Sequence, residues 1–183
     1  MAFRIVIGDV TIGIQGQDFA YIFSVGMGGM ESLYKDGKEW LYRAPRPAFW
    51  RAATDNDRGN GFVFRSAVWS AADRFVRCVK VTARMDEQEI SMPPAPENNK
   101  YNGDKTCDRF EISYTYETPT VPVTEVTVSY LVESDGRIHV QVDYLGKQGL
   151  PELPVLGLRF LMPTAAEGYT YEGLSGETYP DRM

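Results

Sequence analysis

The chain has 183 residues, and its 19 Lys and Arg against 25 Asp and Glu give a formal net charge of −6. This length allows one large domain or two small ones, and the acidic balance argues against nucleic acid or an anionic membrane as a partner. One His and two Cys are too few for a structural zinc site with four such ligands, and they exclude most His-based catalysis.

The cellular compartment is indicated by the signals that the sequence lacks. No apolar run approaches the ~18 residues of a membrane helix, and the first residues do not have the pattern of a signal peptide. Cys78 and Cys107 have no metal or redox spacing, so reduced thiols are expected. We therefore expect a cytoplasmic protein with no metal site.

The first predicted elements are strands. Residues 3–25 predict two strands around a glycine-rich turn, because Phe19, Tyr21 and Phe23 alternate with residues of the opposite face. Residues 42–61 contain two prolines and the cluster DNDRG, which predicts a long ordered loop.

One short helix is predicted over residues 65–76. Its apolar residues Val68, Ala72, Phe75 and Val76 share one face at helical spacing.

The second half of the chain predicts strands with period-two alternation. Their apolar faces fall in residues 79–85, 110–116, 126–132, 138–144 and 156–162. Residues 92–108 are rich in Pro, Asn and Gly, which predicts a flexible, exposed loop. The polar face on each strand favours an all-β antiparallel sandwich, and residues 1–183 are expected to form a single domain.

Few residues suggest catalysis or metal binding. His139 lies on the polar face of a predicted strand, which is typical of a solvated histidine. From Asp55, the sixth and twelfth positions are Asn60 and Ser66, so the cluster DNDRG does not match a calcium loop. Its side chains are expected to cap loop amides and the following helix, to bind a cation in another geometry, or to recognise another domain or a sugar.

A distinctive motif lies in residues 47–59. Its segment FWRAATDNDRG closely resembles the signature FWRAPTDNDRG of β-galactosidases of glycoside hydrolase family 2, near the start of their last, small-chain domain. Ala53 stands where that family usually has Pro. Two further motifs follow in the order in which the family has them. Residues 154–160 (PVLGLRF) resemble the family's PRIGLRF, and residues 173–182 (GLSGETYPDR) resemble a shortened GLGPxENYPDR.

The resemblance implies a supersandwich like that of galactose mutarotases, truncated here to the N-terminal part of the domain. It also implies that the catalytic Glu pair and the magnesium site lie on a separate (β/α)8 barrel, so no catalytic residue, metal or cofactor is assigned to this chain. The implied role is a non-catalytic fragment that packs beside the barrel, in the same chain or as the small subunit of a two-chain enzyme. There it would help shape the site for retaining hydrolysis of terminal β-galactosides.

Two other functions stay open at this point. The many aromatic residues are compatible with a free-standing carbohydrate-binding module, whereas a mutarotase is disfavoured because the single His lies on a polar face. A partial sandwich is expected to leave open edges or an apolar face, and therefore to self-associate.

The predicted binding or interface residues are charged and amide side chains beside apolar Phe49 and Trp50, where Arg–Asp pairing is expected to orient the loop. They are Arg51, Asp55, Asn56, Asp57, Arg58, Tyr179, Asp181 and Arg182.

Overall fold

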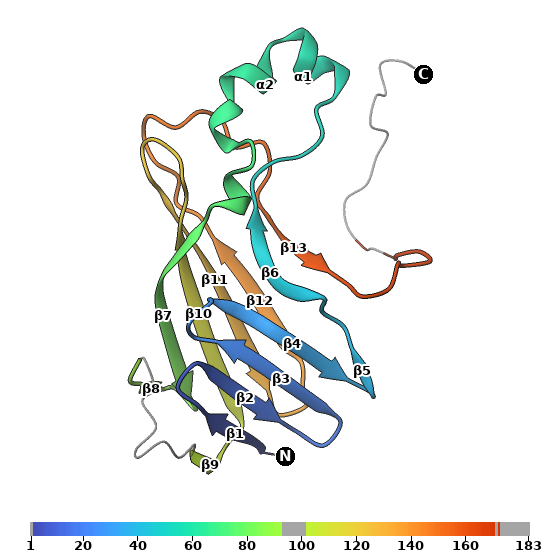
Figure 1. Cartoon of the computed structure of the whole chain (residues 1–183), viewed down its shortest axis with the longest axis vertical. Helices are drawn as coiled ribbons and strands as arrows, with labels where there is room; N and C mark the ends of the chain where they lie inside the picture. Colours follow the sequence, from blue (N-terminus) through green and yellow to red (C-terminus); the bar gives the residue numbers. More distant parts are fainter. Residues whose placement is uncertain (1, 93–101, 171, 173–183) are drawn as a thin grey trace.

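The chain folds mainly into two antiparallel sheets that lie face to face (Figure 1). The computed structural model describes residues 2–92, 102–170 and 172, and for residues 102–104 it describes the backbone only. A smaller pair of strands lies beside the two main sheets. The all-β antiparallel sandwich predicted from the sequence is confirmed.

The first sheet has six strands in the order β5-β4-β3-β2-β1-β9. Five of them follow one another along the chain as a meander, and the last joins from the middle of the sequence. Their bounds are β1 (Phe3–Ile7), β2 (Thr11–Gln15), β3 (Phe19–Ser24), β4 (Gly29–Lys35), β5 (Lys38–Glu39) and β9 (Asn102–Cys107).

The second sheet has five strands in the order β12-β11-β10-β7-β8. Their bounds are β7 (Arg77–Met85), β8 (Gln88–Ile90), β10 (Arg109–Glu117), β11 (Glu125–Glu133) and β12 (Ile138–Asp143). The long strands β10 and β11 pair over nine residues each, with Tyr114 opposite Val128. Alternate residues of both strands are buried, as the period-two pattern predicts.

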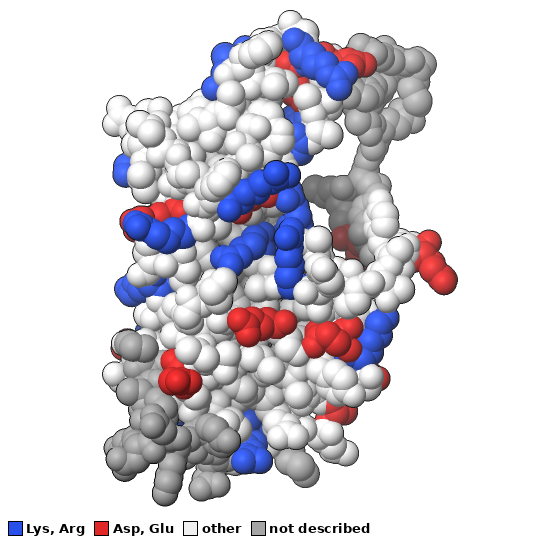
Figure 2. Space-filling model, viewed as in Figure 1, with Lys and Arg blue, Asp and Glu red and all other residues white. Residues whose placement is uncertain are grey.

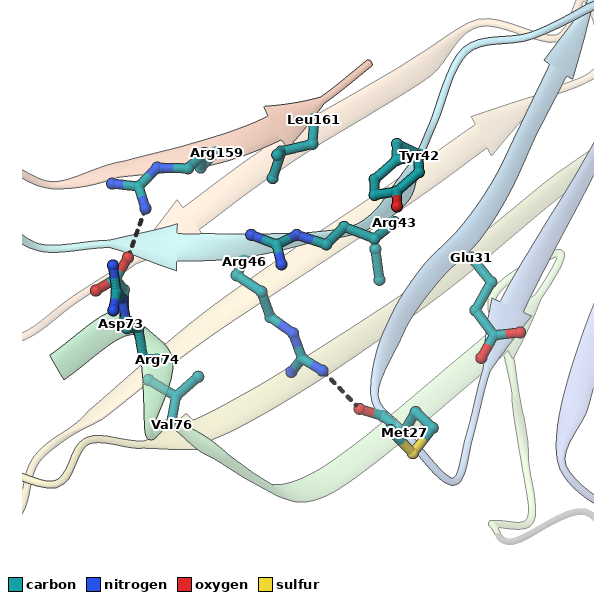
Figure 3. Close-up of a pocket in the computed structure, with 11 residues that line it drawn as sticks. Met27, Glu31, Tyr42, Arg43, Arg46, Asp73, Arg74, Val76, Arg159 and Leu161 are labelled. Carbon is teal, nitrogen blue, oxygen red and sulfur yellow. Dashed lines mark hydrogen bonds and ion pairs between the residues drawn. The ribbon is translucent and has the colours of Figure 1, made fainter. Parts of the chain in front are cut away.

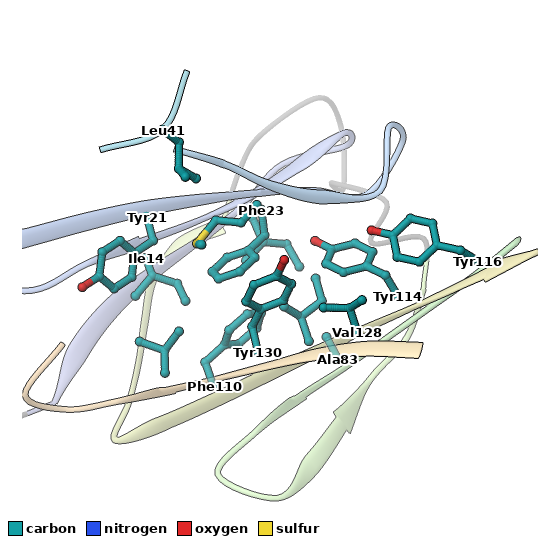
Figure 4. Packing of buried hydrophobic residues seen from close by; sticks show 14 of the residues in the cluster. Ile14, Tyr21, Phe23, Leu41, Ala83, Phe110, Tyr114, Tyr116, Val128 and Tyr130 are labelled. Carbon is teal, nitrogen blue, oxygen red and sulfur yellow. The ribbon is translucent and has the colours of Figure 1, made fainter. Parts of the chain in front are cut away.

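Aromatic side chains fill the space between the two sheets (Figure 4). The ring of Phe23 from the first sheet lies 5.8 Å from Phe110 and 5.7 Å from Tyr130 of the second. Tyr114 packs edge-on against Tyr130 at 6.2 Å and donates a hydrogen bond to the carbonyl of Gly29 in the opposite sheet. Burying each such side chain contributes roughly 1.5–3 kcal/mol to stability, so this layer holds the sheets together.

Strand β7 departs from the predicted alternation at one residue. Its pairing with β10 shifts between Thr115 and Tyr116, where Tyr116 faces Cys78 while Thr115 faces Lys80. The extra residue, Val79, is 41% exposed, although the sequence pattern predicts that it faces inward with Val81. A bulge of this kind inserts one residue and reverses the faces beyond it.

The loop predicted over residues 92–108 is wrong at its C-terminal end, and residues 93–101 lie outside the described residues. Residues Asn102–Cys107 form β9, which pairs with β1 and places Phe3 opposite Cys107. Asp108 separates β9 from β10, so the chain passes from one sheet to the other there. The backbone N–H groups of Asp108 and Arg109 both donate to Oδ1 of Asp86, at 3.0 and 2.9 Å.

The long loop predicted over residues 42–61 contains a strand, so that prediction is wrong in part. Strand β6 (Arg43–Ala48) pairs with β13 (Gly157–Leu161) as a separate two-stranded sheet. Pro45 and Pro47 alternate along β6, so their missing N–H groups fall on one edge of the strand and pairing can use the other. Proline favours a loop when only local propensity is considered, but an edge strand tolerates it.

The single helix predicted over residues 65–76 is wrong. The helical turns are α1 (Asp55–Gly59), α2 (Phe62–Arg65) and two 3₁₀ turns, η1 (Ala67–Trp69) and η2 (Ala72–Arg74). Ser66 ends α2 and its hydroxyl donates to the carbonyl of Glu152 at 2.9 Å. Ala71 has φ 63°, a left-handed conformation that interrupts a right-handed helix.

The last predicted strand carries apolar residues outward. Leu156, Phe160 and Met162 are 41%, 43% and 49% exposed, so they do not lie in the core, and of the three only Phe160 is part of β13. Among the described residues, no helix has the length and apolar character needed to cross a membrane.

Candidate functional site

The signature loop, defined here as residues 49–61, begins in the core and ends in solvent. Phe49 is fully buried and its ring lies 5.5 Å from that of Trp69. Trp69 donates from its indole nitrogen to the carbonyl of Pro151 at 3.2 Å and packs edge-on against Tyr144. Figure 1 shows α1 beyond the end of the two main sheets.

Arg51 and Asp57 form the central ion pair of the signature loop. The guanidinium donates two parallel hydrogen bonds, from Nη1 to Oδ2 at 2.5 Å and from Nη2 to Oδ1 at 3.1 Å. The Asp57 side chain is only 12% exposed, and Arg51 also lies over the ring of Phe62. Such two-point pairing fixes the direction of both side chains.

Asp57 also closes the N-terminus of α1. Its carboxylate accepts from the Thr54 backbone N–H at 2.8 Å, and its own N–H donates to the Thr54 hydroxyl at 3.2 Å, a reciprocal capping box. The hydrogen bonds from Arg51, and then from Thr54, hold the pKa of Asp57 well below its ordinary value of 3.8. The carboxylate is therefore an ionised, structural acceptor and not a proton donor.

The remaining predicted residues of the signature loop lie at its surface. Asp55 and Arg58 pair at 3.0 Å across one turn of α1, with side chains 90% and 68% exposed. Asn56 is exposed beside them. The predicted Arg–Asp pairing is thus present, and Asp57 accepts from a loop amide as expected, but the cluster forms α1 itself and does not cap a helix over residues 65–76. Contact of these residues with a ligand or another domain stays a prediction.

Three predicted site residues cannot be compared with the loop. Tyr179, Asp181 and Arg182 lie outside the described residues.

The single histidine lies away from the signature loop. His139 is on β12, where Nε2 lies 3.3 Å from the Glu133 carboxylate and the side chain is 55% exposed. Across the described ranges, no three His, Cys, Asp or Glu side chains lie close enough to hold a metal ion.

The structure also contains a charged groove that the sequence does not predict. The arginine groove, as we call it, encloses about 810 Å³ beside β6, β13 and η2. Figure 2 shows Lys and Arg side chains gathered in the middle of this face, and Figure 3 shows the lining residues. Four arginines line it, from three separate segments of the chain: Arg43, Arg46, Arg74 and Arg159.

The charges in the arginine groove are only partly balanced. Arg159 pairs with Asp73 at 2.6 Å, and Arg46 donates to the carbonyl of Met27 at 3.3 Å (Figure 3). The other acid on its lining is the exposed Glu31. The groove cannot be predicted from motif spacing because its residues come from distant segments of the chain. The only local signal is the pair Arg43 and Arg46 within β6.

Comparison with known proteins identifies the family. Residues 15–183 match the family described as β-galactosidase small chain. The chain is 56% identical over 179 residues to the β-galactosidase small subunit of Latilactobacillus sakei. This aligned region covers 98% of this chain and 56% of that protein. It is 38% identical over 180 residues to the β-galactosidase of Clostridium acetobutylicum, covering 98% of this chain and 18% of that protein.

The chain thus spans about half of the small subunit and less than a fifth of the longer β-galactosidase. A third relative, the β-galactosidase of Streptococcus thermophilus, is 32% identical over 181 residues, covering 98% of this chain and 16% of that protein. The resemblance carried by the sequence motifs is confirmed by these matches. Because the family match extends over most of the chain, the protein belongs to the β-galactosidase small-chain family.

Proposed function

We propose that this chain is a non-catalytic part of a β-galactosidase, which packs against a separate or covalently joined catalytic barrel and helps shape its galactoside site. The reaction of the whole enzyme would be retaining hydrolysis of terminal β-galactosides. Within that assembly the sandwich would correspond to a galactose-mutarotase-like supersandwich. The names of the relatives support this role, since one is a β-galactosidase small subunit and the other is a longer β-galactosidase.

The observation that carries the proposal is the internal order of the signature loop. Its family motif is held by the Arg51–Asp57 pair and by the anchor of Phe49 on Trp69, so it presents one surface at the end of the sandwich. A preordered surface loses less conformational entropy when it binds a partner. The exposed Asp55, Asn56 and Arg58 would then contact the barrel or substrate.

The proposal is tested by mixing the purified chain with a large β-galactosidase chain from the same genome. We expect association in light scattering, and turnover of a chromogenic β-galactoside only when the catalytic chain is present. Turnover by this chain alone, or no association at micromolar concentrations, would overturn the proposal.

A matched pair of variants tests the role of the signature loop. Arg51→Met removes the two-point pair of the loop, whereas Arg58→Met removes only a pair at its exposed surface. We expect the first variant to weaken association more than the second, because it frees the whole loop. Equal affinities of both variants and wild type would contradict this role.

A second candidate function is sugar binding by the chain itself, supported by Trp40. This residue is 36% exposed and borders a pocket with Met162, Thr164 and Glu167. An exposed indole beside polar groups can stack on a sugar ring. Calorimetric titration with galactose and lactose tests it, and Trp40→Ala should abolish any heat of binding.

We also propose self-association through exposed apolar residues in and beside β13. Leu156, Phe160 and Met162 project from one segment and are each more than two-fifths exposed. Covering them would remove apolar surface from water. Light scattering at high protein concentration tests this, and a clean monomer would contradict it.

A further inference from the structure

We infer that the arginine groove binds a carboxylate-rich polypeptide segment. Under the function proposed above, on which this identity of the partner rests, the segment belongs to the catalytic chain. The groove therefore defines a second contact surface, separate in residues from the signature loop.

The first argument is the local excess of positive charge. The groove lining holds four arginines against Asp73 and Glu31, a local balance of 4 − 2 = +2, although the whole chain carries −6. Like charges gathered in this way repel one another unless a counter-charge lies between them. A ligand with several carboxylates supplies that counter-charge.

The second argument is the state of the individual guanidinium groups. Arg159 is engaged by Asp73, whose side chain is only 12% exposed. Arg43 and Arg74 are exposed and have no ion pair among the described residues. Their donors are therefore available, and a guanidinium matches a carboxylate with two parallel hydrogen bonds.

The third argument is the support beneath the groove. The guanidinium of Arg46 lies 5.7 Å from the centre of the Tyr116 ring and donates to the carbonyl of Met27. Tyr116 is fully buried in the row of tyrosines between the sheets. These two contacts orient the Arg46 side chain along the groove lining.

The apolar part of the lining favours a polypeptide over a bare anion. Met27 and Tyr42, which are 69% and 74% exposed, line the groove together with Val76 and Leu161. Aromatic, methionine and arginine side chains are enriched in protein interfaces. Phosphate groups alone would use the charges but not these surfaces, and a long nucleic acid would meet the acidic remainder of the chain.

The test begins with the full chain and a fluorescein-labelled octaglutamate peptide, followed by fluorescence anisotropy at low salt. The groove variant is Arg43→Glu/Arg74→Glu. The control variant is Lys38→Glu/Lys80→Glu, which changes two exposed lysines outside the groove and reaches the same net charge, −6 − 4 = −10. Tripolyphosphate serves as a competitor.

We expect the groove variant to bind octaglutamate at least about tenfold more weakly than the control variant, and added salt to weaken binding to wild type. Equal loss in both variants would mean a general charge effect and would overturn the inference. Tripolyphosphate that binds more tightly than the peptide would overturn it in favour of a simple anion site. Arg43→Gln/Arg74→Gln provides the same test without new charges if the first variant unfolds.

A second measurement separates this inference from the proposed function. Wild type, groove variant and control variant are each titrated with the large catalytic chain. If wild type does not associate, the proposed function fails, whereas octaglutamate binding still decides whether the groove accepts carboxylates. If wild type and groove variant associate equally, the function stands and the groove is not the contact surface.

Discussion

The signature loop and the arginine groove both concentrate charge, but they use it in opposite ways. In the loop, Asp57 accepts from Arg51 and from the backbone of Thr54, so the buried charge is satisfied within the chain. In the groove, Arg43 and Arg74 have no acidic partner in the described part of the chain. Internal pairing contributes stability, whereas unpaired charge costs stability and is available for binding. The two regions should therefore respond differently to mutation.

The largest effect is expected where the loop meets the core. Trp69→Ala removes a fully buried indole that contacts Phe49 and Tyr144 and bonds to Pro151. We expect a loss of about 3–5 kcal/mol in the free energy of unfolding, measured by urea denaturation. The control Phe64→Ala changes an 83% exposed ring, and a similar loss there would show that the anchor is not at Trp69.

The next effect concerns the charge of Asp57. Because its pKa is lowered on folding, ionisation stabilises the fold above its ordinary value of 3.8, and this contribution disappears as the pH falls toward the folded-state pKa. We expect Asp57→Asn to melt below wild type at neutral pH, with the gap closing in acid. Melting temperatures from pH 7 down to about pH 2 test this. A gap that does not depend on pH would mean that the pair is not the cause.

The third effect separates the cap from the ion pair. Thr54→Ala removes the hydroxyl that accepts from Asp57 N–H but leaves Arg51 in place. We expect a loss of about 1 kcal/mol by urea denaturation, typical of an N-cap. Thr54→Ser keeps the hydroxyl and should stay close to wild type. If serine destabilises as much as alanine, the methyl group and not the cap is responsible.

The smallest effect on stability is expected in the groove. Arg43→Gln/Arg74→Gln removes two charges with no acidic partner in the described part of the chain, so the free energy of unfolding should change by less than about 0.5 kcal/mol. Any change should be a gain that is larger at low salt, because repulsion is relieved. A clear loss would mean that these arginines stabilise the fold, and the contrast with the loop would fail.

The long strands of the second sheet were predictable because their burial has a short period, whereas residues 3–25, predicted as two strands, form three. The faces containing Phe110 and Val126 alternate as expected, since one side of each strand packs in the core. The error at Val79 came from a bulge, which depends on pairing with β10 and leaves no local signal. The proline-containing β6 was missed because the propensity of proline is judged without knowing that the strand lies at an edge.

The candidate site was predictable to the extent that it is local. Arg51 and Asp57 lie six positions apart within one motif, so their opposite charges and short separation along the chain predict the pair that forms. The arginine groove depends on β6, η2 and β13, and Arg43 and Arg159 are distant in sequence. Only the fold brings these arginines together, so periodicity and motif spacing could not predict the arginine groove.

Because the chain crosses from one sheet to the other at Asp108, we expect the two sheets to unfold cooperatively. Strand β9 belongs to the first sheet and β10 to the second, with one residue between them, and Asp86 bonds both N–H groups at the crossing. Separating the sheets would disturb β9 at the edge of the first sheet and β10 in the middle of the second. The free energies of opening from amide hydrogen exchange should therefore be similar in β1 and in β10. The sandwich would then unfold as one unit, although its sheets come from different parts of the chain.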